Sequence, residues 1–70
     1  MKTKYIIREV KSNTYFLGAN PYPVFGAMDD GIIYFDNLQE AENRLNEEFE
    51  LFGEGKFEGM VIEINKVYTF

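Results

Sequence analysis

Residues 36–53, which read DNLQEAENRLNEEFELFG, decide the fold. Their apolar residues recur at intervals of three and four, which is the period of one face of an α-helix. Asp36 or Asn37 can cap this helix, because a short side-chain oxygen accepts a hydrogen bond from an unpaired first-turn N–H, and Glu40 stands where a capping-box partner would. Gly53 follows the last apolar position, where helices commonly end in a left-handed conformation. The stretch predicts one amphipathic helix whose inner side carries Leu38, Ala41, Leu45, Phe49 and Phe52.

The outer side of this helix is strongly acidic. Residues 36–58 contain eight acids and two bases, a local charge of −6, whereas residues 1–16 carry a local charge of +3. One interpretation is a solvated face that keeps a small protein soluble. The other is an anionic docking surface for a basic partner, because complementary charges steer association. The residues expected to point outward are Glu40, Glu42, Asn43, Arg44, Asn46, Glu47, Glu48 and Glu50, and the docking interpretation uses Glu42, Glu47, Glu50 and Glu54.

The composition excludes most catalytic chemistry. Seventy residues make one domain, 1–70, with room for one helix and a small sheet. Cysteine and histidine are absent, so disulfides, zinc sites built on these residues and the common Cys–His or Ser–His nucleophiles are excluded. Ser12 is the only serine, and it falls in an expected turn. We therefore expect a non-enzymatic protein without a cofactor or a metal.

Charge and hydropathy narrow the range of partners. The net charge of −5 disfavours direct binding of nucleic acid, which depends on Lys and Arg to displace counterions. No apolar run approaches the roughly 20 residues that a helix needs to cross a bilayer. The apolar run after the basic residues 1–4 is also too short for the core of a secretion signal. We expect a cytoplasmic protein with no membrane partner.

Four segments are rich in β-branched and aromatic residues and are predicted as strands, namely 5–10, 14–17, 32–35 and 57–70. The order strand, strand, loop, strand, helix, strand predicts an α+β fold, in which a small antiparallel or mixed sheet of about four strands packs the helix on one face.

In the predicted strand 57–70, the alternation of residues indicates which side chains face the helix. Met60, Ile62 and Ile64 should face it, and Tyr68 continues the alternation. A single helix leaves the other face of the sheet open, and a homodimer through that face would cover it. The apolar residues expected on the open face are Tyr5, Ile7, Phe57, Val61 and Val67.

Residues 18–31 are predicted to form an irregular loop, because Pro21 and Pro23 lack N–H donors and restrict the residues before them. Long loops in small domains are commonly functional. Three uses of this loop remain open: a satellite core over the sheet edge, an aromatic anchor for a partner, or a platform that stacks on a nucleotide base. The residues concerned are Tyr22, Phe25, Met28, Asp29 and Asp30, of which the two acids would repel a phosphate.

The aspartates also have two interpretations. Asp29, Asp30 and Asp36 could hold a hard cation together with loop carbonyls. Their ordinary use is as turn residues and a helix cap, which needs no ion.

Three segments carry a resemblance: residues 4–8 (KYIIR), 34–42 (YFDNLQEAE) and 60–64 (MVIEI). In these segments the chain resembles the short, acidic, cysteine-free proteins encoded by bacteriophages and mobile elements, including anti-CRISPR and other anti-defence proteins. The resemblance implies inhibition by occupying the surface of a host protein, and it carries over no functional residue. The four bases near the start of the chain depart from an all-round mimic of nucleic acid.

The leading hypothesis is therefore a phage-type inhibitor or adaptor that binds a basic surface of a host protein through the acidic helix face, the aromatic loop, or both. A second hypothesis is an oligomer that binds or sequesters a small molecule such as a nucleotide between protomers. A third is a structural subunit that assembles through the open sheet face.

Overall fold

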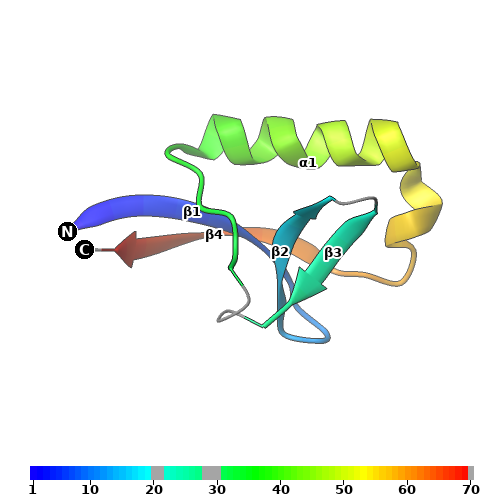
Figure 1. Cartoon of the computed structure of the whole chain (residues 1–70), viewed down its shortest axis with the longest axis horizontal. Helices are drawn as coiled ribbons and strands as arrows, with labels where there is room; N and C mark the ends of the chain where they lie inside the picture. The colour runs from blue at the N-terminus through cyan, green and yellow to red at the C-terminus, as the bar shows by residue number, and fades with distance from the viewer. Residues whose placement is uncertain (20–21, 28–30, 70) are drawn as a thin grey trace.

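The computed structural model describes residues 1–19, 22–27 and 31–69, apart from the side chain of Glu54. In chain order the elements are β1 (Lys2–Glu9), β2 (Thr14–Ala19), β3 (Pro23–Gly26), α1 (Leu38–Phe52), the short 3₁₀ helix η2 (Glu54–Phe57) and β4 (Ile62–Thr69). The four strands form one antiparallel sheet in the order β3-β2-β1-β4, and α1 lies across one face of it (Figure 1). The predicted α+β fold, with one helix on a small sheet, is confirmed.

The helix forms as its sequence predicts. The side-chain oxygen of Asn37 accepts a hydrogen bond from the N–H of Glu40 at 2.9 Å, and the Glu40 carboxylate reaches back to the N–H of Asp36 at 3.3 Å. Gly53 ends the helix with a φ of 79°, and its N–H bonds to the carbonyl of Phe49. The N-cap and the terminating glycine are both confirmed.

The sheet is split between β1 and β2. All eight residues of β1 pair with β4, from Lys2 opposite Thr69 to Glu9 opposite Ile62, whereas β1 meets β2 only through its last two residues. Beyond that point β2 diverges, and residues 32–35 enter the gap between the two strands. Phe35 exchanges two backbone hydrogen bonds with Tyr5, at 2.8 and 2.9 Å.

The prediction of a strand at 32–35 is therefore wrong in its extent. The segment is extended but makes only an isolated bridge, because its two sides bond to two different neighbours. On the β2 side, the N–H of Ile33 bonds to the carbonyl of Phe16 at 3.2 Å. The segment therefore lies between β1 and β2 and bonds to each of them, without forming a continuous strand.

The prediction of an irregular loop throughout 18–31 is also wrong, because Pro23–Gly26 forms β3. Pro23 is tolerated because it is the first residue of a strand at the edge of the sheet, where a missing N–H breaks no necessary bond. Phe25 in this strand packs on Phe16 with ring centroids 5.6 Å apart.

The core lies between α1 and the sheet. Ile7, Phe16, Phe35 and Ala41 form its buried centre, and Tyr5, Phe25, Ile33, Leu45, Ile62 and Ile64 pack around them. Ile62 and Ile64 thus contact the helix side as predicted.

The expectation that Tyr5, Ile7 and Phe57 lie on the open face is wrong. Ile7 pairs with Ile64, and directly opposed residues share a face, so the odd-numbered residues of β1 point toward the helix. Phe57 is 7% exposed and meets the ring of Phe49 edge-on, with centroids 4.7 Å apart.

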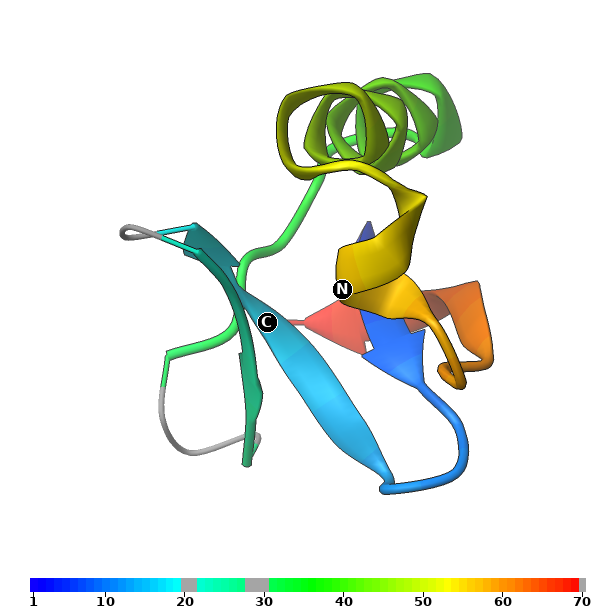
Figure 2. The same cartoon turned by 90° about the vertical axis from the view of Figure 1, so that its right-hand side faces the viewer.

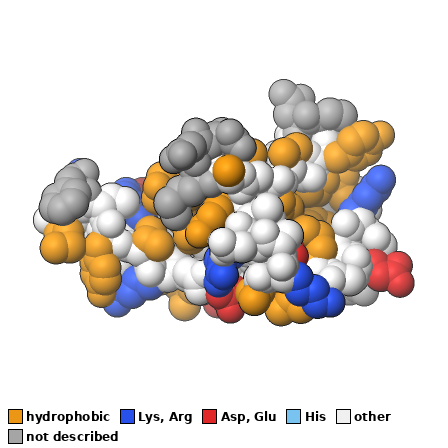
Figure 3. Space-filling model, turned by 90° about the horizontal axis from the view of Figure 1, so that it is seen from below, with side chains coloured by type: hydrophobic (Ala, Val, Ile, Leu, Met, Phe, Trp, Pro, Cys, Tyr) orange, Lys and Arg blue, Asp and Glu red, His pale blue; other side chains and the backbone are white. Residues whose placement is uncertain are grey.

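The opposite face of the sheet carries mixed chemistry. The register places Lys4, Ile6 and Arg8 of β1 there, opposite Val67, Asn65 and Glu63 of β4. Figure 3 shows this face with hydrophobic side chains in separate groups among charged ones. Because Tyr5, Ile7 and Phe57 lie elsewhere and Ile6 is only 2% exposed, the face presents less apolar surface than the sequence suggests.

Candidate functional site

The outer face of α1 is the most polarised surface among the described residues. Glu40, Glu42, Glu47 and Glu50 are exposed on it, and none of them takes part in a described ion pair. Three of the seven bases form ion pairs with other acids: Lys4 pairs with Asp36, Arg8 with Glu63 and Arg44 with Glu48. Figure 2 shows the helix standing above the sheet with its outer side uncovered.

The four glutamates do not lie on one line. Glu40 and Glu47 are seven residues apart, nearly two turns, and Glu50 follows one turn later, so these three form a stripe along the helix. Glu42 is two turns before Phe49 and therefore lies on the flank that faces β4. The predicted acidic face thus consists of an outer stripe and a separate acid beside β4.

The expectation that Glu48 points outward from the acidic face is wrong, because this residue is only 3% exposed. It lies two turns after the small, fully buried Ala41, which leaves room for a longer side chain on the inner side. One carboxylate oxygen accepts a hydrogen bond from Nε of Arg44 at 2.8 Å, and the other has no hydrogen-bond partner among the described residues. Arg44, also expected to point outward, lies with its guanidinium 5.4 Å from the ring centroid of Phe16.

The predicted aromatic cluster of the loop is divided. Phe25 belongs to the core, as the satellite-core interpretation expects. Tyr22 is 57% exposed, and its ring meets Phe52 at 6.3 Å while Nζ of Lys56 lies 4.7 Å from its centroid. Tyr22 therefore joins the C-terminal end of α1 to η2 and keeps one side in solvent. Met28, Asp29 and Asp30 lie outside the described residues, as does the side chain of Glu54.

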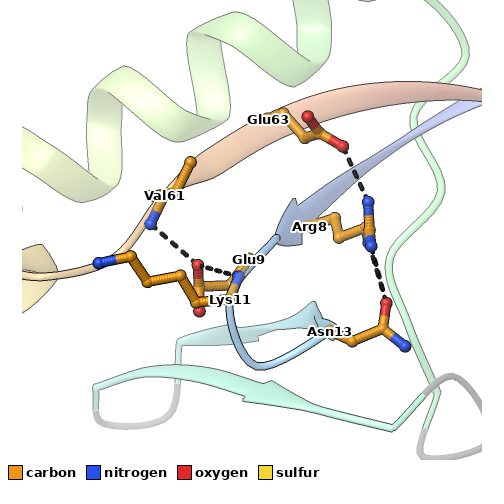
Figure 4. Close-up of polar contacts among 6 residues, drawn as sticks. All are labelled: Arg8, Glu9, Lys11, Asn13, Val61 and Glu63. Carbon is orange, nitrogen blue, oxygen red and sulfur yellow. Dashed lines mark hydrogen bonds and ion pairs between the residues drawn. The ribbon is translucent and has the colours of Figure 1, made fainter.

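A polar cluster that the sequence did not reveal surrounds Glu9 (Figure 4). Its buried carboxylate accepts hydrogen bonds from the N–H groups of Lys11, Ser12 and Val61 at 2.9–3.0 Å and from the Ser12 hydroxyl. Burial alone would raise the pKa of the Glu9 carboxyl, but these bonds outweigh it and lower the pKa from about 4.5 to about 2. The cluster ties the β1–β2 turn to the start of β4, which is a structural role.

Arg8 reinforces the same turn from the other face. Its guanidinium donates to the side-chain oxygen of Asn13 at 2.9 and 3.1 Å and to Glu63 at 2.9 Å (Figure 4). Asn13 has a φ of 56°, a conformation that Asn adopts more readily than most residues. The only sequence signal for this arrangement is the acid followed by the Lys-Ser-Asn turn.

A shallow apolar groove lies at the start of β4. Phe49 of α1, Phe57 of η2, Met60 and Ile62 line it, and its volume is about 310 Å³. This size is at the lower end of the range for small-molecule sites. Glu42, on the same flank of α1, places a negative charge about two turns from Phe49 of the groove.

The described residues give little support to a metal site. Among them, no three Asp or Glu side chains approach closely enough to share an ion. Asp36, one of the three aspartates considered, instead pairs with Lys4, whose hydrogen bond and charge lower the pKa of its carboxyl. No helix in the described parts of the chain has the length and apolar character to span a membrane.

The chain matches no known protein family, no curated protein and no solved structure.

Proposed function

We propose that this chain is a non-enzymatic binding protein of the inhibitor or adaptor type, which docks the outer stripe of α1 on a basic surface of another protein. The observation that carries the proposal is the set of exposed glutamates on one side of a helix, without ion pairs among the described residues. The resemblance to phage-encoded anti-defence proteins makes a host protein the first partner to test.

Helix stability does not account for this charge pattern. The last turn of α1 contains no basic residue, and Glu50 opposes the helix dipole there. Leu51, four residues after Glu47, is 74% exposed and lies beside the acidic stripe. An exposed apolar side chain among acids gives a contact surface both a desolvated anchor and a charged rim, as in protein interfaces.

The test is capture of partners by the immobilised protein from a nuclease-treated bacterial lysate, with elution by rising salt. We expect a stoichiometric protein that elutes as salt rises, because salt screens exposed charge pairs. Glu47→Lys should weaken capture strongly. Glu58→Lys is the matched control, since it makes the same change in net charge at an exposed residue outside α1. Equal capture by both variants would reject the docking stripe.

A second candidate function rests on the groove lined by Phe49, Phe57, Met60 and Ile62. An apolar groove of this kind suits a small flat molecule better than a phosphorylated one, because Glu42 lies nearby. A ligand that binds only the folded state stabilises it by an amount that grows with the logarithm of one plus the ratio of ligand concentration to Kd, so the melting temperature rises with ligand concentration. A thermal-shift screen of nucleobases and aromatic metabolites tests this candidate function. If no compound in the library raises the melting temperature, the candidate function is rejected.

A further inference from the structure

The outer edge of β4 is open along the described part of the chain. Tyr5 uses both its N–H and its C=O to bond Phe35, so neither group points toward Lys66, its partner across β1 and β4. In an antiparallel pair such positions alternate with hydrogen-bonded ones. The N–H and C=O groups of Ile62, Ile64, Lys66 and Tyr68 therefore point away from β1, at an edge that no described strand covers.

This edge lacks the protection of the opposite one. β3 is four residues long and starts with a proline, whereas β4 presents eight residues without a proline or a break in its ladder. Long open edges are templates for pairing with a further strand. The groove lined by Phe49, Phe57, Met60 and Ile62 lies on the helix side at the first residue of β4.

Tyr68 has an exposed aromatic side chain that could fill an apolar groove of this kind. It is on the helix side of β4 by register, opposite Thr3, yet it is 63% exposed. The reason is visible in Figure 1, where the paired ends of β1 and β4 extend past the start of α1, so that the helix does not cover them. The strand thus carries an apolar groove at one end and an uncovered aromatic ring at the other.

We propose that β4 pairs antiparallel with β4 of a second copy of this chain, with Asn65 facing the partner's Asn65. In this register Ile62 lies opposite the partner's Tyr68, and the outward backbone groups of both strands meet. Opposed residues share a face, so the partner's Tyr68 lies beside Ile62 in the groove under Phe49. The contact occurs twice by symmetry, as an isologous interface requires.

Charge complementarity favours this register. The partner's Lys66 lies opposite Ile64, about 7 Å along the strand from Ile62. α1 and β4 run in opposite directions, so Glu42 lies about 10 Å from Phe49 in the same direction. The stem of a lysine spans the remaining few ångströms, which pairs the partner's Lys66 with Glu42. A shift that sets Lys66 opposite the partner's Lys66 would place like charges together.

The dimer leaves the outer stripe of α1 free, because that stripe faces away from the sheet on which the pairing occurs. The inference therefore stands independently of the proposed function. It also differs from a homodimer through the open sheet face, since the contact here is made by the edge of β4.

Sedimentation equilibrium from micromolar to millimolar concentrations tests the proposal. We expect a monomer–dimer equilibrium for the natural chain. Tyr68→Ala should raise the dissociation constant roughly 100- to 10,000-fold, because it removes both symmetry-related rings and each buried aromatic ring accounts for roughly 10- to 100-fold. Lys66→Pro should abolish the dimer but keep the fold, because the N–H that it removes points away from β1. Lys66→Ala retains that N–H and should retain a weakened dimer.

A charge exchange tests the register separately. Glu42→Lys alone and Lys66→Glu alone should each weaken the dimer, and the double variant should restore it. A monomer at all concentrations would overturn the proposal, and so would a dimer that Tyr68→Ala and the charge exchange leave unchanged. Circular dichroism checks that each variant is folded. If Lys66→Pro does not fold, Tyr68→Ala and the charge-exchange variants decide the question.

Discussion

Replacing Phe57 by alanine should remove the contact that holds η2 beneath the end of α1. Phe57 is the only buried residue of η2 whose side chain the structure describes, at 7% exposed, and its ring packs edge-on against Phe49 at 4.7 Å. Deletion of a buried Phe side chain costs about 3–5 kcal/mol. The neighbouring groove is open, so part of the space can be filled by relaxation or water, and we expect about 3 kcal/mol.

That loss is large for a chain of this size. A domain of 70 residues has a total free energy of unfolding of about 3.5–10 kcal/mol. A loss of about 3 kcal/mol corresponds to a fall in melting temperature of roughly 12–24 °C. Thermal and urea unfolding followed by circular dichroism measure it, and Leu51→Ala is the control, since an exposed residue of the same region should change stability by less than about 0.5 kcal/mol.

A double-mutant cycle with Phe49→Ala isolates the ring contact. The two rings should couple by about 0.5–1.5 kcal/mol, the range for edge-to-face aromatic pairs. If Phe57→Ala lowers the free energy of unfolding no more than Leu51→Ala does, then η2 does not depend on this packing. If the two phenylalanine substitutions are strictly additive, the rings do not interact and the account of the groove wall is wrong.

Three further predictions concern polar and terminal positions. The lowered pKa of Glu9 means that its contribution to stability is complete above about pH 4.5 and is lost as the pH falls toward 2; urea unfolding across this range should show the stability difference between the natural chain and Glu9→Gln shrinking as the pH falls, and a constant difference would contradict it. Asn37→Ala should cost about 0.5–2 kcal/mol by loss of the N-cap, measured by thermal unfolding against Asn46→Ala as an exposed control. Glu50→Lys should stabilise the helix by about 0.3–1 kcal/mol, because it complements the dipole in the last turn, while it weakens capture of the proposed partner; a loss of both stability and binding would instead indicate misfolding.

The helix and the fold class follow from local signals, which the structure confirms. Asn37 and Gly53 act through their own conformational chemistry, and the apolar period of α1 needs no knowledge of the rest of the chain. Which segments become strands depends instead on the segments that lie next to them in the folded sheet. Pro23 argues against a central strand, but it does not reveal that the segment lies at the edge of the sheet, where a proline is acceptable.

The sequence predicts the burial of individual side chains less well than it predicts the helix and the strands. Glu48 reads as one more outward acid, and only the gap left by Ala41 and the nearby Arg44 make it an inward one. Glu9 gives no sign in the sequence that four donors converge on it, because one of them, the N–H of Val61, comes from 52 residues away. Tyr68 has the right alternation, but its exposure depends on where the helix begins relative to the strand.

The long ladder between β1 and β4 has a consequence for how the chain reaches its native state. Every one of its eight pairs joins residues at least 53 positions apart, from Glu9 with Ile62 to Lys2 with Thr69. Such contacts are slow to form, because the entropy of closing a long loop is lost before the contacts repay it. The β1–β2 turn and α1 can form early, whereas the strand that completes the core, with Ile62 and Ile64, joins last. Until it does, the unpaired edge of β1 and the inner side of α1 are available to other chains, so misassembly during folding would begin at the same strands that finish the fold.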